Sequence, residues 1–153
     1  ILLGGQDIEA FNRNGEKPTV KIADNETELL NKLRQQLQQN AKDQDSTAII
    51  TKTLADAKLL AQQLADKSVT LIQSENQRLA LGTIIVPSYL AKGLEFDAVV
   101  IWHADWTRYA AEDERRLLYT VASRAMHRLT LLAEKSVTPL LDHVGAERYE
   151  VEK

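Results

Sequence analysis

The sequence predicts an α/β protein with a mostly parallel sheet and helices on its faces. Three observations support this prediction. Short apolar runs alternate along the chain with longer amphipathic segments. The runs AIIT, TIIV and AVVIW are continuously apolar, which is typical of strands buried on both faces. Parallel strands need crossover connections, and the amphipathic segments between the runs are long enough to form helices.

Three segments have the periodicity of helices. The first covers residues 25–42, and Asn25 with Glu28 at its start resembles a capping box. Its leucines recur at helical spacing, namely Leu29, Leu30, Leu33 and Leu37. The second and third helices cover residues 53–67 and 112–127. The apolar stripe of the second consists of Leu54, Ala57, Leu60, Ala61 and Leu64.

The remaining apolar runs are predicted strands. They cover residues 18–23, 46–52, 69–73, 82–87, 98–104, 128–133 and 148–151. A short helix is expected near residues 138–144. In parallel sheets, ligands bind beyond the carboxyl ends of the strands. The loop PSYLAKGLEFD, residues 87–97, begins at one of those ends, so its polar residues are candidate ligand contacts.

The composition bounds the class of protein. With 153 residues, 44% hydrophobic and 27% charged, the chain is expected to be a single domain over residues 1–153. A net charge of −3 argues only weakly against a nucleic-acid binder. The lack of cysteines and of long apolar runs predicts a cytoplasmic protein without a membrane partner. Because the chain opens ILLGG without Met, we expect a fragment of a longer protein.

The loop contains residues of three useful kinds. Gly93 lets the backbone approach a ligand or adopt a positive φ. Lys92 can meet a phosphate as a mobile charge, and Glu95 can accept hydrogen bonds from sugar hydroxyls. Phe96 is expected in the core. On these residues alone, the simpler interpretation is a solvated connection whose glycine makes the turn.

The third predicted helix presents a basic stripe. Arg116, Thr120 and Arg124 are spaced four residues apart. We interpret Arg116 and Arg128 as parts of a solvated basic face. Arg124 differs because it lies between small residues in SRA, so its guanidinium can reach an adjoining cleft. An arginine there can stabilise charge on a transferring γ-phosphate.

Other residues give weaker signals. His103 and Asp105 are metal-ligand types, but two ligands do not make a site, and we interpret them as a polar strand end with no metal bound. Trp102 is expected in the core, whereas Trp106 is either a core residue or a platform for a base. The chain has no Gly-Lys dipeptide, so it has no P-loop of its own.

Two blocks of sequence resemble a known family. AKGLEFDAVVIW followed by ERRLLYTVASRAMHRLTLL resembles the last two conserved blocks of superfamily I DNA helicases of the UvrD/Rep/PcrA type. The earlier segments IEAFNRNGEKPTV and AIITKTLADAKLLAQQL are similar to the helicase IV/HelD-like branch. The resemblance implies the second, C-terminal RecA-like motor domain of an ATP-dependent helicase.

The resemblance also implies roles for the candidate residues. ATP with Mg²⁺ would be held mainly by the N-terminal RecA-like domain of the same protein. Glu95 would contact the ATP ribose, Arg124 would meet the γ-phosphate, and Lys92 and Gly93 would shape the loop that couples nucleotide to DNA.

The single-strand contact of the family usually reads Thr-x-His just before AKGLEF. The equivalent residues here are Pro87 and Tyr89, with Ser88 between them. Tyr89 can still stack on a base of single-stranded DNA, and we predict nucleic-acid contacts at Tyr89 and Ser88.

Two alternatives remain open. HelD-like relatives act on RNA polymerase, so the motor can be one that remodels this partner rather than unwinding DNA. The other alternative is an α/β interaction module that binds no nucleotide.

Overall fold

The computed structural model describes residues 17–43, 45–77, 82–143 and 148–152. Within these residues, seven strands form one sheet in which every neighbouring pair is parallel. The strands are β1 (Thr19–Ala23), β2 (Thr47–Thr51), β3 (Val69–Leu71), β4 (Thr83–Pro87), β5 (Phe96–Trp102), β6 (Ala125–Glu134) and β7 (Glu150–Glu152). Their order across the sheet is β3-β4-β2-β5-β6-β1-β7. The predicted fold class is confirmed, and each predicted strand is present.

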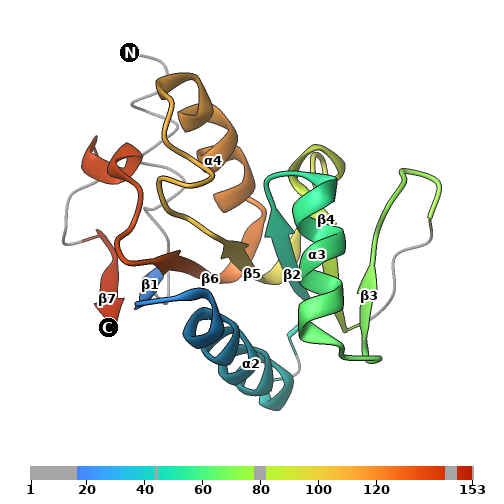
Figure 1. Cartoon of the computed structure of the whole chain (residues 1–153). Coiled ribbons are helices and arrows are strands. Elements are labelled where there is room, and N and C mark those ends of the chain that lie inside the picture. The colour runs from blue at the N-terminus through green and yellow to red at the C-terminus, as the bar shows by residue number, and fades with distance from the viewer. Residues whose placement is uncertain (1–16, 44, 78–81, 144–147, 153) are drawn as a thin grey trace.

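Helices cover both faces of the sheet (Figure 1). The α-helices are α2 (Glu26–Lys42), α3 (Leu54–Leu64) and α4 (Arg115–Ala122). Short 3-10 helices cover Ser88–Leu90, Glu112–Glu114 and Pro139–His143. Leucines of α2 and α3 pack with Ile49, Ile85 and Val100 on one face. Those of α4 pack on the other face, with Ile50, Val86, Ile101 and Leu131. Among the described residues, no helix is both long and apolar enough to span a membrane.

The starts of α2 and α3 follow the sequence closely. The side chain of Asn25 accepts a hydrogen bond of 2.9 Å from the backbone N–H of Glu28, which confirms the predicted N-cap of α2. The carboxylate of Glu28 accepts from the N–H of Asp24, at 3.2 Å, rather than from that of Asn25. Thr53 caps α3 in the same way as Asn25 caps α2.

The third predicted helix, over residues 112–127, is too long. A 3-10 turn precedes α4, which ends at Ala122, and residues from Ala125 onward belong to β6. Phe96 at the start of β5 pairs with Ala125, so the backbone there is extended alongside a neighbouring strand. This non-local pairing outweighs the local preference of the segment for a helix.

Candidate functional site

The loop between β4 and β5 runs from the edge of the sheet where the parallel strands end, the carboxyl edge, to the edge where they begin, the amino edge. β4 and β5 are parallel to the strand between them, β2, so β4 ends at the carboxyl edge and β5 begins at the amino edge. Ser88–Leu90 lies at the carboxyl edge, and Glu95 directly precedes β5 at the amino edge. The expectation that the contacts of this loop gather at the carboxyl ends is therefore wrong for Glu95.

Gly93 makes the turn in the middle of this loop. Its φ is +76°, in the left-handed region that favours glycine. A Cβ atom at this position would meet no atom within 4 Å, so the backbone conformation, not crowding, requires the glycine. The neighbouring Lys92 is exposed, and its ammonium group is available to a ligand.

A shallow groove joins two of the predicted contacts. It has a volume of about 350 Å³, and Tyr89 and Lys92 line it together with Ser74 and Gln77 from the segment after β3. Tyr89 is 50% exposed, which leaves its ring free to stack. The groove thus brings an exposed aromatic ring and a cation together at the carboxyl edge.

Ser88 does not share this groove. It is only 4% exposed, and its hydroxyl donates a hydrogen bond of 2.8 Å to the carbonyl oxygen of Lys52. This bond fixes the start of the loop to the end of β2. The predicted contact of Ser88 with nucleic acid stays a prediction, and the observed role of its side chain is to hold the loop.

Glu95 and Arg124 lie next to each other in the sheet. Each directly precedes the first residue of a strand, and those first residues, Phe96 and Ala125, are paired in register. The backbone N–H of Phe96 donates a hydrogen bond of 2.9 Å to the carbonyl oxygen of Arg124. The two residues that the sequence places 29 positions apart are therefore neighbours at the amino edge.

The guanidinium of Arg124 is held by neutral groups. Its Nε donates to the carbonyl oxygen of Thr120 at 3.2 Å, and Nη2 donates to the hydroxyl of Ser123 at 3.0 Å. Within the described residues it forms no ion pair. Arg124 therefore keeps an uncompensated positive charge that is positioned but not neutralised.

The other two arginines differ from Arg124. Arg116 is exposed, as expected for a solvated face. Arg128 is not solvated, because its guanidinium donates to the side chains of Asn40 at 2.9 Å and Asp43 at 2.6 Å. Arg128 thus ties β6 to the end of α2, and the prediction for this residue is corrected.

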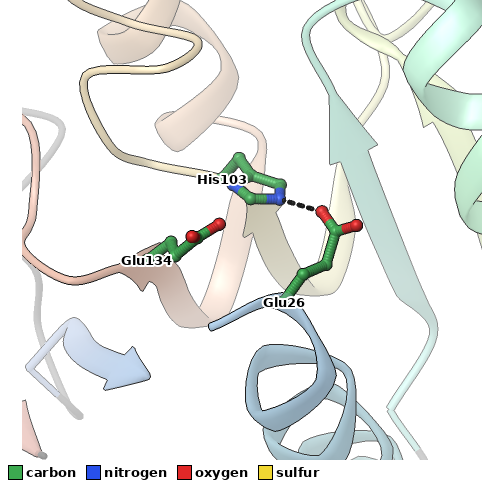
Figure 2. Close-up of side chains that lie close together, drawn as sticks. All are labelled: Glu26, His103 and Glu134. Atoms are coloured by element: carbon green, nitrogen blue, oxygen red, sulfur yellow. Dashed lines mark hydrogen bonds and ion pairs between the residues drawn. The ribbon is translucent and has the colours of Figure 1, made fainter. Parts of the chain in front are cut away.

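A second polar cluster lies at the carboxyl edge. His103 follows β5, is 1% exposed, and contacts Asp105 through Nδ1 at 2.9 Å and Glu26 through Nε2 at 2.8 Å. Burial alone lowers the pKa of His103, but the hydrogen bonds to Asp105 and Glu26 outweigh it and raise the pKa above its ordinary value. Figure 2 shows Glu134 beside this pair.

No sequence pattern joined these residues. Glu26 begins α2 and Glu134 ends β6, and both are remote from His103 along the chain. Only the strand order, with β6 between β5 and β1, brings the three together. Trp102, as expected, is buried at 2% exposure, whereas Trp106 is 61% exposed.

Comparisons with known proteins assign the chain to a family. Residues 84–132 match the UvrD-like helicase C-terminal domain. The crystal structure of the C-terminal domain of a possible DNA helicase from Lactobacillus plantarum WCFS1 is 45% identical in sequence. The match covers 99% of this chain and 96% of that one, with a TM-score of 0.86. The chain belongs to the UvrD-like helicase C-terminal domain family.

More distant helicases share the fold. The PRRSV helicase is 15% identical with a TM-score of 0.57, and the match covers 95% of this chain and 32% of the viral one. An arterivirus nonstructural protein 10 helicase, solved with DNA, is 7% identical with a TM-score of 0.56, over 96% and 36% of the two chains. No curated protein matches the sequence.

The matched region, residues 84–132, contains most of the candidate site residues. It runs from β4 to β6 and so contains the loop after Pro87, the start of β5 and Arg124. Glu26 and Glu134 lie outside it. The matched region thus includes Glu95 and Arg124 at the amino edge and the Tyr89 and Lys92 side of the groove, but neither Ser74 and Gln77 nor the whole cluster around His103.

Proposed function

We propose that the chain is the second motor domain of an ATP-dependent DNA helicase. In this role it completes a nucleotide site held mainly by an N-terminal RecA-like domain, which supplies the P-loop and the contacts to Mg²⁺. The observation that carries the proposal is the pairing of Phe96 with Ala125, because it places Glu95 and Arg124 on one edge of the sheet. The placement in the helicase IV/HelD-like branch rests on the sequence resemblance alone.

Arg124 is the residue best suited to the γ-phosphate. Its guanidinium is held by a carbonyl and a hydroxyl, and neither neutralises its charge. A phosphoryl group in transfer carries negative charge on its equatorial oxygens, and an arginine that contacts them accelerates the reaction by about 10³–10⁵. Domain closure brings Arg124 to the nucleotide, and opening withdraws it.

Glu95 has a different role in the same site. Its exposed carboxylate can accept hydrogen bonds from the ribose hydroxyls, each worth about 1.5–3 kcal/mol when charged and desolvated. A sugar contact positions the nucleotide without touching the reacting phosphate. Glu95 is therefore a binding residue, whereas Arg124 acts on the chemical step.

The groove at the opposite edge is suited to single-stranded DNA. The Tyr89 ring offers a stacking surface for a base, which is worth about 1–3 kcal/mol, and Lys92 offers a charge to a backbone phosphate. The loop that begins with Ser88 ends with Glu95, so one short segment connects the DNA groove to the nucleotide edge. Movement of this loop on ATP binding would displace the groove.

The test uses the full-length protein that contains both motor domains. Arg124→Ala is expected to lower the DNA-stimulated ATPase rate by about 10³ or more, while leaving the far-UV circular dichroism unchanged. Arg116→Ala is the matched control, because Arg116 is an exposed arginine of the same segment. A near-wild-type ATPase rate of Arg124→Ala would contradict the proposal.

A second candidate function keeps the ATPase but changes its target. Pro87 and Ser88 are buried, so of the three residues in the Thr-x-His position only Tyr89 faces solvent. This reduced nucleic-acid contact favours a motor that remodels RNA polymerase. A strand-unwinding assay beside a pull-down with RNA polymerase separates the two functions, since ATP-dependent unwinding without polymerase binding supports the helicase.

A further inference from the structure

Three potential metal ligands meet at the carboxyl edge of the sheet, opposite to the edge that holds Arg124. Glu26 is the first residue of α2, His103 follows β5 and Glu134 ends β6. One ligand atom from each lies within 4.8 Å of the other two. In Figure 2 the Glu26 carboxylate faces the imidazole, and the carboxylate of Glu134 points toward the same ring.

The histidine is oriented like a metal ligand. Histidines that bind metals usually donate from their other ring nitrogen to a carboxylate, which fixes the tautomer and the ring orientation. Here Nδ1 of His103 lies 2.9 Å from Oδ2 of the fully buried Asp105, which leaves Nε2 to face the glutamates. The same carboxylate accepts the backbone N–H of Glu134 at 2.8 Å. Asp105 therefore positions two of the three ligands.

The anchoring of Asp105 makes this orientation rigid. Its Oδ1 accepts hydrogen bonds from the backbone N–H and the hydroxyl of Thr107. Hydrogen bonds from the backbone N–H groups of Thr107 and Glu134 and from the Thr107 hydroxyl thus fix Asp105, which keeps Nδ1 of His103 turned toward it and Nε2 turned toward the glutamates. An ion at Nε2 displaces the proton between this nitrogen and Glu26.

The side chains of the proposed ligands differ in how far they are exposed to solvent. The side chain of His103 is 2% exposed, whereas that of Glu26 is 38% exposed, so an ion can enter from the side of α2. A tetrahedral ion with bonds of about 2.0–2.1 Å holds its ligand atoms about 3.3 Å apart. The Nε2 of His103 and Oε1 of Glu26 are 2.8 Å apart, so they need to separate only slightly to bind one ion. Rotation of the Glu134 side chain then brings its carboxylate to the same ion as the third ligand.

We propose that Glu26, His103 and Glu134 form a binding site for one divalent transition-metal ion of the Zn²⁺ class. An imidazole nitrogen with two carboxylates suits Zn²⁺ better than Mg²⁺ or Ca²⁺, which prefer oxygen ligands alone. Three protein ligands leave a position for water. The bound ion joins the start of α2 to the ends of β5 and β6.

The test measures zinc on the tag-free 153-residue chain after removal of metal with a chelator. Equilibrium dialysis against Zn²⁺, read by mass spectrometry of the metal, is expected to give one ion per chain that millimolar Mg²⁺ does not displace. The double variant Glu26→Gln with Glu134→Gln is expected to lose zinc affinity by at least about 100-fold. Its circular dichroism should match that of the wild type.

His127→Gln is the control, because His127 is an exposed histidine whose side chain is 66% accessible. This variant should bind zinc like the wild type. Less than half an ion per wild-type chain, equal zinc affinity of the double variant, or loss of zinc from His127→Gln would each overturn the proposal. ATPase activity is not part of the measurement, so failure of the helicase proposal leaves the zinc result interpretable.

Discussion

The backbone N–H of Phe96 donates a hydrogen bond of 2.9 Å to the carbonyl oxygen of Arg124. This bond joins the end of the loop that carries Glu95 to the end of the segment that carries Arg124. A shift of either segment therefore strains the start of the other strand. In the function that we propose, this bond keeps the sugar contact of Glu95 and the phosphate contact of Arg124 at a constant spacing while the domain moves as a unit.

Glu95→Ala should affect nucleotide binding more than catalysis. Because we place Glu95 on the ribose, its loss is expected to raise the KM for ATP by about tenfold with little change in kcat. Steady-state ATPase assays of the full-length protein give both constants. The wild type should also discriminate against 2′,3′-dideoxy-ATP, and the variant should not. Equal discrimination by both proteins would rule out a sugar contact.

Tyr89→Ala should weaken binding of single-stranded DNA by about tenfold, since a base loses its stacking surface. Tyr89→Phe keeps the ring and should bind like the wild type. Fluorescence anisotropy with a labelled oligonucleotide measures both affinities. Trp106→Ala removes an exposed aromatic ring that lies outside the groove and should leave the affinity unchanged. A larger effect from Trp106 than from Tyr89 would move the DNA contact elsewhere.

Gly93→Ala should lower the free energy of unfolding by about 1–2 kcal/mol, because the Cβ atom of alanine is sterically strained at the positive φ of +76°. Gly93→Asn should cost less, since asparagine tolerates this conformation better. Urea titrations monitored by circular dichroism measure the difference. Gly82→Ala is a matched comparison, with φ of +92° and no atom within 4 Å of the added Cβ. Equal stability of Gly93→Ala and wild type would show that the turn relaxes.

Two buried tyrosines should respond oppositely to removal of their hydroxyls. The hydroxyl of Tyr109 is buried without a hydrogen-bond partner among the described residues, so Tyr109→Phe should be neutral or stabilising by up to about 1 kcal/mol. The hydroxyl of Tyr119 donates to the carbonyl oxygen of Leu140 at 2.7 Å. Tyr119→Phe should destabilise by about 1 kcal/mol. Thermal unfolding of both variants tests the contrast.

The central strands β2, β4 and β5 were predictable because their apolar runs are continuous, a property that each run carries by itself. The length of α4 was not, since its end depends on the pairing of Ala125 with Phe96 in a distant part of the sequence. The same limit applies to Arg128, whose partners on α2 are about 85 residues away. Local periodicity cannot report such contacts.

The candidate site follows the same division. The motifs pointed to Glu95 and Arg124 as candidates, but local sequence could not show that the two residues are neighbours in the sheet. That proximity follows from strand order, which places β6 beside β5, and from the register that pairs Phe96 with Ala125. His103 and Asp105 were recognised as a polar strand end. Glu26 and Glu134 were missed because they lie on helix α2 and strand β6, which are remote from His103 along the chain.

The outermost strands of the sheet, β3 and β7, are each three residues long. Every residue of β7 is exposed, and two of its three residues are glutamates. A short, negatively charged border offers little unpaired backbone on which another polypeptide can add a strand. At β7 the described sheet therefore resists edge-to-edge aggregation, although its central strands are apolar.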